Sequence, residues 1–578
     1  GTAVTQDQLH LPDLSTVSLG GLLGDRVSRS EQARLLKVDE EELLDGFRHR
    51  PGKHPWIGEH VGKWLHAASL AYMNTQDKAL REKLDRVATG LIETQEPDGY
   101  LGTYEPAKRF GLYELRDWDV WAHKYNLLGL LAYYQATSNT CALDTCKRVG
   151  DLLIQTFGPG KKSILSAGTH VGMAATSVLE PMVLLYRASG EKRYLDVAEY
   201  LVGAWEEKDG PRILTSLLAG APVNKVANGK AYEMLSNLCG LCELYRVTGK
   251  EDYLKAVLNA WTDIASNRLY ITGSGSAHEH WQQDHDLPND KANSICETCV
   301  TVTWLQLNVQ LLRLRGEARF AEELEKTIYN HLLAAQRASG DDWCYYTPLI
   351  GQKPFDFGTN CCHSSGPRGV ALLPALVYGA ADDGITVNLY TPSRAVLPLP
   401  GGGEVTVEQQ TTYPLDGVVS LSLMPKDHDA PFAVCLCVPA WSPRLEVQVN
   451  GEAQSTPEVK DGWLILQRAW KAGDTVRLGL DLAPRYVVGD HGNAGRAAVL
   501  YGPLVLALDA ALNPSPLDNF TLTTPLNLHI TSRAEEQPLF TTPARLTKDG
   551  RTDSVDLTLT PYYACGQDKS DFLIWLKN

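Results

Sequence analysis

Four residues with metal-binding side chains stand in two short groups that lie far apart in the chain. Glu297 and Cys299 open an apolar segment, and Cys361 and Cys362 are adjacent in a segment rich in glycine and serine. One carboxylate and three thiolates form a donor set that zinc accepts in tetrahedral geometry. We expect the Gly/Ser-rich segment to be a loop, which can bend to bring both of its thiolates to one ion. The alternative is that these are buried cysteines that bind no metal.

A zinc ion with these four ligands would have no free coordination position for a water molecule. Such a site is therefore either structural or uses one of its own thiolates as the reagent, because the thiolate is the nucleophilic form of cysteine. A nucleophile of this kind needs a partner acid that protonates the leaving group. The nearest candidate is Glu279, in a segment that is dense in polar residues. The neighbours that crowd there are His278, His280, Trp281 and Asp286. Each of them could equally be a solvated loop side chain.

Two cysteine pairs, Cys239/Cys242 and Cys296/Cys299, also have the spacing of a structural zinc site with four cysteines. Cys239 and Cys242 are flanked by leucines at helical spacing, so packing in a helical core is the preferred interpretation. The chain contains 12 cysteines in 578 residues, which is too few for a disulfide scaffold.

Aromatic and polar residues are clustered in four further segments of the chain. Aromatic rings can stack on sugar faces and carboxylates can hold sugar hydroxyl groups, so this pattern indicates a carbohydrate site. The 13 tryptophans could equally pack in a core. The segments are Trp56–Trp64, Gln95–Tyr104, Trp118–Gly129 and Trp343–Leu349, and they contain Glu59, His60, His123 and Tyr346.

Helical hairpins in the first two thirds of the chain must position these residues. Five segments each contain an apolar helix, a tight turn and a second helix. The turns fall at Gln76, Asn139, Gly190, Gly249 and Gly316. A sixth hairpin near residues 25–70 or 360–380 would close an (α/α)6 toroid. Loops at one rim of such a ring converge on a central cavity, where residues from distant repeats can meet.

From about residue 383 the sequence alternates between apolar and polar residues in short segments bounded by Gly, Pro and Asn. This pattern predicts strands, and their number and shortness favour one or two β-sandwich modules. The predicted fold class is multidomain α plus β, with an (α/α)6 toroid followed by β-sandwich modules. The predicted parts are an N-terminal strand segment packed on the β region (1–20), the toroid (21–382), a β-sandwich domain (383–485) and a C-terminal β-rich domain (486–578).

The composition argues against two classes of function. The formal net charge is −15 and there is no long Lys/Arg block, so the chain would repel the phosphate backbone of a nucleic acid. No apolar run approaches the roughly 20 residues that span a membrane. The chain begins with Gly1 instead of Met, as it would after removal of a signal peptide or in a trimmed chain. We expect a periplasmic or secreted protein, with a cytoplasmic location as the alternative.

Several motifs together resemble the β-L-arabinofuranosidases of glycoside hydrolase family 127 and its relatives. The motifs are Glu297-Thr298-Cys299, Cys361-Cys362, Gln95–Tyr104, Tyr270–Gly273 with Asp286–Asp290, and His123-Lys124 before Gly129. The resemblance covers almost the whole chain, including its β-rich part. It implies an (α/α)6 catalytic barrel that carries β-sandwich domains, and a zinc ion held by one glutamate and three cysteines.

Carried over by position, the resemblance assigns a role to each candidate residue. The zinc ligands would be Glu297, Cys299, Cys361 and Cys362, with Cys361 as the nucleophile and Glu279 as the general acid/base. The anomeric configuration would be retained through a thioglycosyl intermediate, with a zinc-held thiolate in place of the usual second carboxylate. The expected substrate is a terminal β-L-arabinofuranosyl or similar furanosyl sugar on a plant polysaccharide or oligosaccharide. The candidate substrate-binding residues are His123, Glu59, His60, His278, Trp281, Tyr346 and Arg368.

The sequence departs from this family where the sugar would be bound. The family's arabinofuranosidases often continue the cysteine pair with Pro-Pro-Asn, whereas this chain continues with His363-Ser364-Ser365. A helix histidine expected to contact the sugar is replaced around 228–234. The alternative substrate is therefore the branched acidic sugar aceric acid of the pectin rhamnogalacturonan II, whose carboxylate Arg368 or Lys230 could pair with.

Two hypotheses from other classes stay open. Lanthionine cyclases and protein prenyltransferases also combine a helical toroid with zinc and thiol chemistry. Their sites include a histidine ligand and an open coordination position, and they do not account for the β-rich part of this chain. A non-catalytic glycan-binding protein with a structural zinc would keep its sugar binding when Cys361 is replaced by serine.

Overall fold

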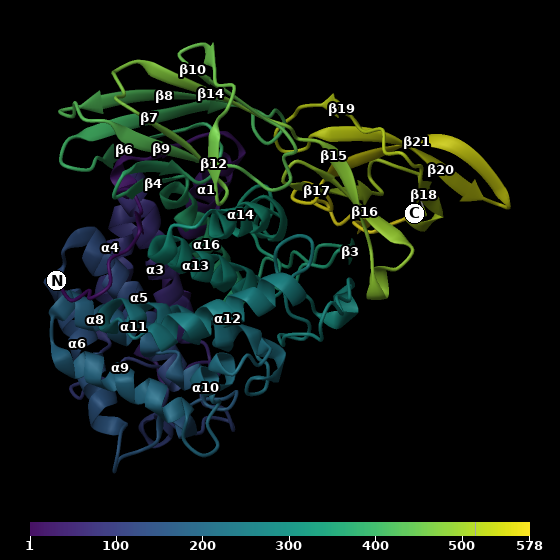
Figure 1. Cartoon of the computed structure of the whole chain (residues 1–578). Helices are drawn as coiled ribbons and strands as arrows, with labels where there is room; N and C mark the ends of the chain where they lie inside the picture. Colours follow the sequence, from purple (N-terminus) through teal and green to yellow (C-terminus); the bar gives the residue numbers. More distant parts are fainter. Residues whose placement is uncertain (515) are drawn as a thin grey trace.

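The computed structural model describes residues 1–514 and 516–578. The helical part runs to the end of α16 (Cys361–Leu376), and nearly all strands follow it in the sequence. Figure 1 shows the helical part in purple to teal, with green and yellow sheets on its outside. Within the described residues, no helix is long and apolar enough to cross a membrane.

Five helical hairpins form most of the helical part. They are α3 (Glu59–Thr75) with α4 (Lys78–Glu93), α5 (Asp119–Thr137) with α6 (Thr140–Thr156), α8 (Leu179–Ser189) with α9 (Lys192–Trp205), α11 (Ala231–Thr248) with α12 (Glu251–Asn267), and α13 (Thr298–Arg315) with α14 (Ala318–Lys326). The first helix of each pair ends at a residue with left-handed backbone, which is Gln76, Ser138, Gly190, Gly249 or Gly316. The five predicted turns are confirmed, with Asn139 capping the second helix of its hairpin.

The sixth hairpin is assembled from both ends of the helical part. Successive inner helices α3, α5, α8, α11 and α13 pack on one another, and α16 packs on both α13 and α3. The six inner helices therefore form a closed ring, and the predicted (α/α)6 toroid is confirmed. Outside α16 lie α1 (Gly21–Arg29) and the π-helix η2 (Ser30–Leu35). The remaining helices are α2 (Glu40–Arg48), α7 (Met173–Thr176), α10 (Ile213–Leu218) and α15 (Leu333–Ala335).

The segment around the cysteine pair differs from the sequence prediction, because α16 begins at Cys361 where we expected a loop. Asn360 caps this helix, and its Oδ1 accepts hydrogen bonds from the backbone N–H groups of Cys362 (2.9 Å) and His363 (3.1 Å). Gly366, which favoured a loop, lies inside the helix where the Trp343 ring packs on the backbone. A Cβ atom there would lie 2.2 Å from that ring. Tertiary packing therefore overrides the local preference for a loop.

Two sheets follow the toroid and lie one over the other in Figure 1. The six-stranded sheet has the order β1 (Leu9–His10), β4 (Tyr378–Ala381), β5 (Gly384–Val387), β9 (Phe432–Cys437), β13 (Trp463–Arg468) and β12 (Glu458–Lys460). The seven-stranded sheet has the order β11 (Glu452–Ala453), β10 (Leu445–Val449), β14 (Asp474–Leu480), β8 (Val418–Lys426), β7 (Glu404–Thr411), β6 (Ser393–Pro398) and β2 (Ser18–Leu19). The N-terminal strands β1 and β2 are edge strands of these sheets, which ties the start of the chain to the β region.

A third, ten-stranded sheet is built mainly from the C-terminal residues. Its order is β15 (Pro484–Val488), β16 (Arg496–Tyr501), β23 (Leu576–Lys577), β18 (Phe520–Leu522), β20 (Leu539–Lys548), β21 (Arg551–Pro561), β17 (Leu504–Asp509), β22 (Phe572–Leu573) and β3 (Ile350–Gly351), with β19 (His529–Ser532) paired to β20. The edge strand β3 belongs to the long segment between α15 and α16. This sheet therefore holds the toroid segment that contains Tyr345 and Tyr346.

Candidate active site

The N-terminal ends of five of the six inner helices, α3, α5, α11, α13 and α16, meet at one rim of the toroid, where a cavity of about 490 Å³ opens. The residues that line it from these helix ends are Glu59 (α3), Trp121 (α5), Tyr232 and Glu233 (α11), Glu297 (the residue before α13) and Cys361 (α16). Helix N-termini carry partial positive charge, which favours carboxylates and thiolates at these positions. The ring of hairpins thus brings acidic and nucleophilic groups from distant repeats into one cavity.

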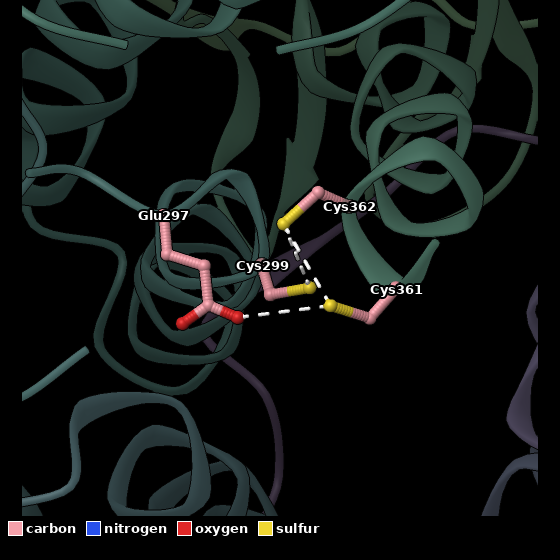
Figure 2. A group of neighbouring side chains, drawn as sticks. All are labelled: Glu297, Cys299, Cys361 and Cys362. Carbon is pink, nitrogen blue, oxygen red and sulfur yellow. Dashed lines mark hydrogen bonds between the residues drawn. The ribbon is translucent and has the colours of Figure 1, made fainter. Parts of the chain in front are cut away.

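Glu297, Cys299, Cys361 and Cys362 form one compact cluster in which the three sulfur atoms and the carboxylate point toward one another (Figure 2). Cys362 Sγ lies 3.5 Å from Cys299 Sγ and 3.9 Å from Cys361 Sγ, and Cys361 Sγ lies 4.0 Å from Glu297 Oε1. A tetrahedral zinc ion with bonds of about 2.3 Å holds two sulfur ligands about 3.8 Å apart. The spacing of the donor atoms therefore fits such an ion.

The electrostatics of the cluster also fit a cation. Burial raises the pKa of Glu297 and of Cys362, and contact with Cys299 together with burial raises the pKa of Cys361. Burial opposes ionisation of Cys299 too, but hydrogen bonds from the other two thiols and the charge of Lys63 bring its pKa below the usual range. The protein alone thus supports one thiolate. Within the described chain, Glu297 Oε2 is buried without a hydrogen-bond partner. A divalent cation would compensate the further negative charges.

Glu279 lines the same cavity from the loop between α12 and α13. Lys230 Nζ lies 3.2 Å from its Oε1, and Tyr346 Oη donates a hydrogen bond of 2.6 Å to its Oε2. Burial raises the pKa of this carboxyl, but Lys230 and Tyr346 lower it by more, so that it lies below the usual value of 4.5. The backbone of Glu279 is left-handed, with φ of 66°. A non-glycine residue in this conformation is held there by its surroundings, as is common at functional sites.

The predicted substrate-binding residues divide into two groups. Glu59 and His278 line the cavity, and Tyr346 contacts Glu279. Glu59 is fixed by a 2.7 Å ion pair with Lys63 and by a hydrogen bond from Trp121 Nε1 (3.1 Å). The structure places the others outside the lining of the cavity, and these are His60, His123, Trp281 and Arg368.

Two of the residues outside the lining support its walls. His123 is fully buried, and its Nε2 accepts a hydrogen bond from the backbone N–H of Leu101, which holds the Gln95–Tyr104 segment on α5. Arg368 lies deeper in the toroid, 5.1 Å from the centre of the Tyr125 ring, and its Nε donates to His66 Nδ1. A sugar in the cavity would therefore not reach the Arg368 guanidinium.

Several lining residues were not identified from the sequence, namely Arg116, His170, Tyr232, Glu233 and Asn360, whereas Tyr345 lies in the predicted aromatic segment Trp343–Leu349. Tyr232 and Glu233 stand in the first turn of α11. Since the N-terminal ends of most inner helices face the cavity, the hairpin pattern itself contained the signal for these two. His170 lies in an irregular segment with φ of 58° and has no periodic pattern around it.

Comparisons with known proteins agree in one family. The family model described as β-L-arabinofuranosidase, GH127 catalytic domain, matches residues 25–375, and the GH127 middle domain matches residues 384–482. The non-reducing end β-L-arabinofuranosidase of Bifidobacterium longum subsp. longum is 28% identical over 560 residues, covering 87% of this chain and 82% of that protein.

Solved structures agree over the whole chain. The GH127 β-arabinofuranosidase BT3674 has a TM-score of 0.85 at 26% identity and covers 99% of this chain and 98% of its own. Ara127N, a GH127 β-L-arabinofuranosidase from Geobacillus stearothermophilus T6, shares the fold with a TM-score of 0.84 at 22% identity, covering 97% and 99%.

Proposed function

Because the chain belongs to glycoside hydrolase family 127 and is a glycoside hydrolase, we propose that it is a retaining, exo-acting β-L-arabinofuranosidase. In this proposal Cys361 is the nucleophile and Glu279 is the general acid/base. One observation carries the proposal: Cys361, in a four-donor cluster, and Glu279 line the same cavity from different repeats. The carboxylate supplies the proton transfer that the thiolate cannot.

The four-donor cluster is proposed to hold zinc through Glu297, Cys299, Cys361 and Cys362. When bound, zinc would keep the thiolates deprotonated and make the sulfur of Cys361 a better leaving group. Lys63, which lies 3.9 Å from Cys299 Sγ and 3.2 Å from the backbone carbonyl oxygen of Cys361, adds a fixed positive charge. The start of α16 is held by its cap at Asn360, so the position of Cys361 is fixed before a sugar enters.

Cys361 and Glu279 both act in each of the two steps. In the first step Cys361 Sγ attacks the anomeric carbon, while Glu279 protonates the departing glycosidic oxygen. In the second step Glu279 accepts a proton from water, and that water displaces the sulfur from the anomeric carbon. Two displacements at one carbon restore its configuration, so the product is the β anomer. Because Lys230 and Tyr346 hold the pKa of Glu279 low, the first step favours acidic pH.

The charges around the cavity favour a neutral sugar. Lys230 Nζ is already engaged by Glu233 (2.8 Å) and Glu279 (3.2 Å). Arg368 does not line the cavity, and Arg116 lies over the Trp56 ring, 5.6 Å from its centre. A sugar carboxylate would therefore compete with two glutamates for Lys230, and the lining sets four carboxylates (Glu59, Glu233, Glu279 and Glu297) against the two side-chain cations Lys230 and Arg116. Release of an acidic sugar such as aceric acid is thus the less favoured alternative.

The same proposal includes the kind of glycan that carries the sugar. A terminal arabinofuranosyl residue on a plant cell-wall polysaccharide or oligosaccharide fits a cavity of about 490 Å³, which accommodates one sugar and the start of its aglycone. Such polymers are met outside the cytoplasm, so a periplasmic or secreted location belongs to the proposal.

The test offers aryl β-L-arabinofuranoside, aryl α-L-arabinofuranoside and an aceric acid-containing pectic fragment to the wild type, Cys361→Ser and Glu279→Gln. We expect turnover of the first substrate alone by the wild type, with the β anomer as the initial product by NMR. Cys361→Ser should lose turnover, Glu279→Gln should turn over the aryl substrate more slowly than the wild type, and both should still bind the sugar. Undiminished turnover by either variant contradicts the assigned roles, and sugar binding without turnover by the wild type identifies a glycan-binding protein.

A further inference from the structure

A second group of metal-binding side chains lies behind the cysteine pair, outside the cavity already described. It consists of Asp342, Asp356 and His363, whose donor atoms all lie within 4.8 Å of one another. Asp342 follows α15, Asp356 stands between β3 and α16, and His363 is in the first turn of α16. We propose that these three residues form a second metal site, which binds a divalent transition cation through one imidazole nitrogen and two carboxylate oxygens.

The distances fit a shared ion better than a hydrogen bond. His363 Nε2 lies 2.9 Å from Asp342 Oδ1 and 2.9 Å from Asp356 Oδ1, so a single proton on this nitrogen could serve only one carboxylate. Neither contact has the direction of a hydrogen bond. Among the described residues, His363 Nε2 and Asp342 Oδ1 have no hydrogen-bond partner although both are buried. Buried polar atoms in this state need an explanation, and a cation between them supplies one.

The spacing also indicates the coordination geometry. A cation about 2.1 to 2.2 Å from each donor atom would see two donors 2.9 Å apart at an angle of about 85°. That angle is close to the right angle between neighbouring ligands of an octahedral ion. A tetrahedral ion would require donors about 3.4 Å apart. One imidazole with two carboxylates suits Mn²⁺, Fe²⁺ or octahedral Zn²⁺, and suits Mg²⁺ and Ca²⁺ less because these prefer oxygen ligands.

The surrounding charges leave the two carboxylates without a direct cationic partner. The nearby guanidinium of Arg34 donates hydrogen bonds from Nη1 and Nη2 to the backbone carbonyls of Asp341 and Gly358. In the described chain it forms no ion pair with Asp342 or Asp356. The side chains of His363 and Asp342 are fully buried, whereas that of Asp356 is 60% exposed. The exposed side provides an entry path and room for the water ligands that complete an octahedron.

A cation at this site would connect three separate segments of the chain, which contain Asp342, Asp356 and His363. It would hold the segment before α16 to the first turn of that helix, and this turn contains Cys361 and Cys362. The second site is therefore a brace for the cysteine pair, with harder donors than the thiolate cluster. It stands independently of the proposed catalytic roles, because binding is measured without any substrate.

The experiment uses the full-length protein, stripped of metal by a chelator and reloaded with one equivalent of zinc to fill the thiolate cluster. Mn²⁺ is then added and its binding is followed by electron paramagnetic resonance and by elemental analysis after gel filtration. We expect one Mn²⁺ per chain in the wild type. His363→Ala and Asp356→Asn should each weaken binding by at least about tenfold. Asp341→Asn, which changes the adjacent carboxylate outside the cluster, should bind Mn²⁺ as the wild type does.

Asp356→Asn keeps the test decisive, because it changes a side chain that is 60% exposed and keeps its shape, and circular dichroism checks that the variant is intact. If the wild type binds no Mn²⁺ or other divalent cation beyond the first zinc, the proposal is wrong. It is equally wrong if folded His363→Ala and Asp356→Asn bind Mn²⁺ as tightly as the wild type. A drop in melting temperature of His363→Ala with no cation bound by either protein would identify a protonated imidazole between two carboxylates and would also overturn the proposal.

Discussion

Replacing Lys230 with methionine perturbs both the stability of the toroid and the protonation of Glu279. The Lys230 side chain is 7% exposed and lies 2.8 Å from Glu233, whose side chain is 1% exposed. Removing one partner of a buried ion pair leaves an uncompensated charge, which costs about 3 to 5 kcal/mol. We expect the free energy of unfolding of Lys230→Met to fall by about this amount at pH 7, measured by urea titration.

The same variant changes the pH dependence with a defined sign. Lys230 holds the pKa of Glu279 below 4.5, so it contributes stability that is complete above that pH and is lost as the pH falls through the lower, folded-state pKa. The difference in unfolding free energy between the wild type and Lys230→Met should therefore become smaller at acidic pH. Because the pKa of Glu279 rises in the variant, its acid form persists to higher pH. The alkaline limb of the kcat/KM profile should accordingly move to higher pH.

The double variant Lys230→Met/Glu233→Gln separates these two effects. It leaves no unpaired charge at position 233, so most of the lost stability should return. Glu279 still lacks its cation, so the alkaline limb of the profile should stay displaced. An unchanged limb in both variants, or an unfolding free energy of the single variant Lys230→Met equal to that of the wild type, would refute the electrostatic role assigned to Lys230.

Three further predictions concern the cluster, the acid and the fold. Glu279→Gln should lower kcat by about 10² to 10⁴ on substrates with poor leaving groups and by less on activated aryl glycosides, and an equal loss on both would argue against a proton-transfer role. A chelator should lower both the melting temperature and the activity, and added zinc should restore both in the wild type but not in Cys299→Ser. If the chelator changes neither quantity, the proposed metal site is wrong. Gly366→Ala places a Cβ atom 2.2 Å from the Trp343 ring and should lower the free energy of unfolding by about 1 to 3 kcal/mol. Gly203→Ala, whose Cβ would lie in open space, should not lower it. Equal melting curves for the two variants would contradict this prediction.

The ring of hairpins could be predicted because its signals are local. Each inner helix has apolar residues at helical spacing and ends at a residue such as Gly249 that tolerates a left-handed backbone. The cluster of four donor side chains could be predicted because Glu297, Cys299 and the adjacent cysteines are rare residue types in a distinctive arrangement. Such features are visible in a single sequence without knowledge of tertiary contacts.

The remaining features depend on tertiary contacts and were missed for that reason. The start of α16 at Cys361 depends on the Asn360 cap and on the packing of Trp343 against Gly366. The direction of Arg368, away from the cavity, follows from the rotation of α16 about its axis, which Gly and Pro residues obscure in the sequence. His170 reaches the cavity from an irregular segment, where no periodicity indicates an orientation.

The most direct test of the proposed mechanism is to identify the atom that carries the sugar during turnover. The protein is mixed with an aryl β-L-arabinofuranoside, quenched in acid during the steady state and digested with pepsin for mass spectrometry. We predict one pentosyl group on the peptide that contains Cys361 and Cys362, with fragmentation placing it on Cys361. A pentosyl group on a carboxylate or on Cys362, or an inverted product without any labelled peptide, would contradict the account.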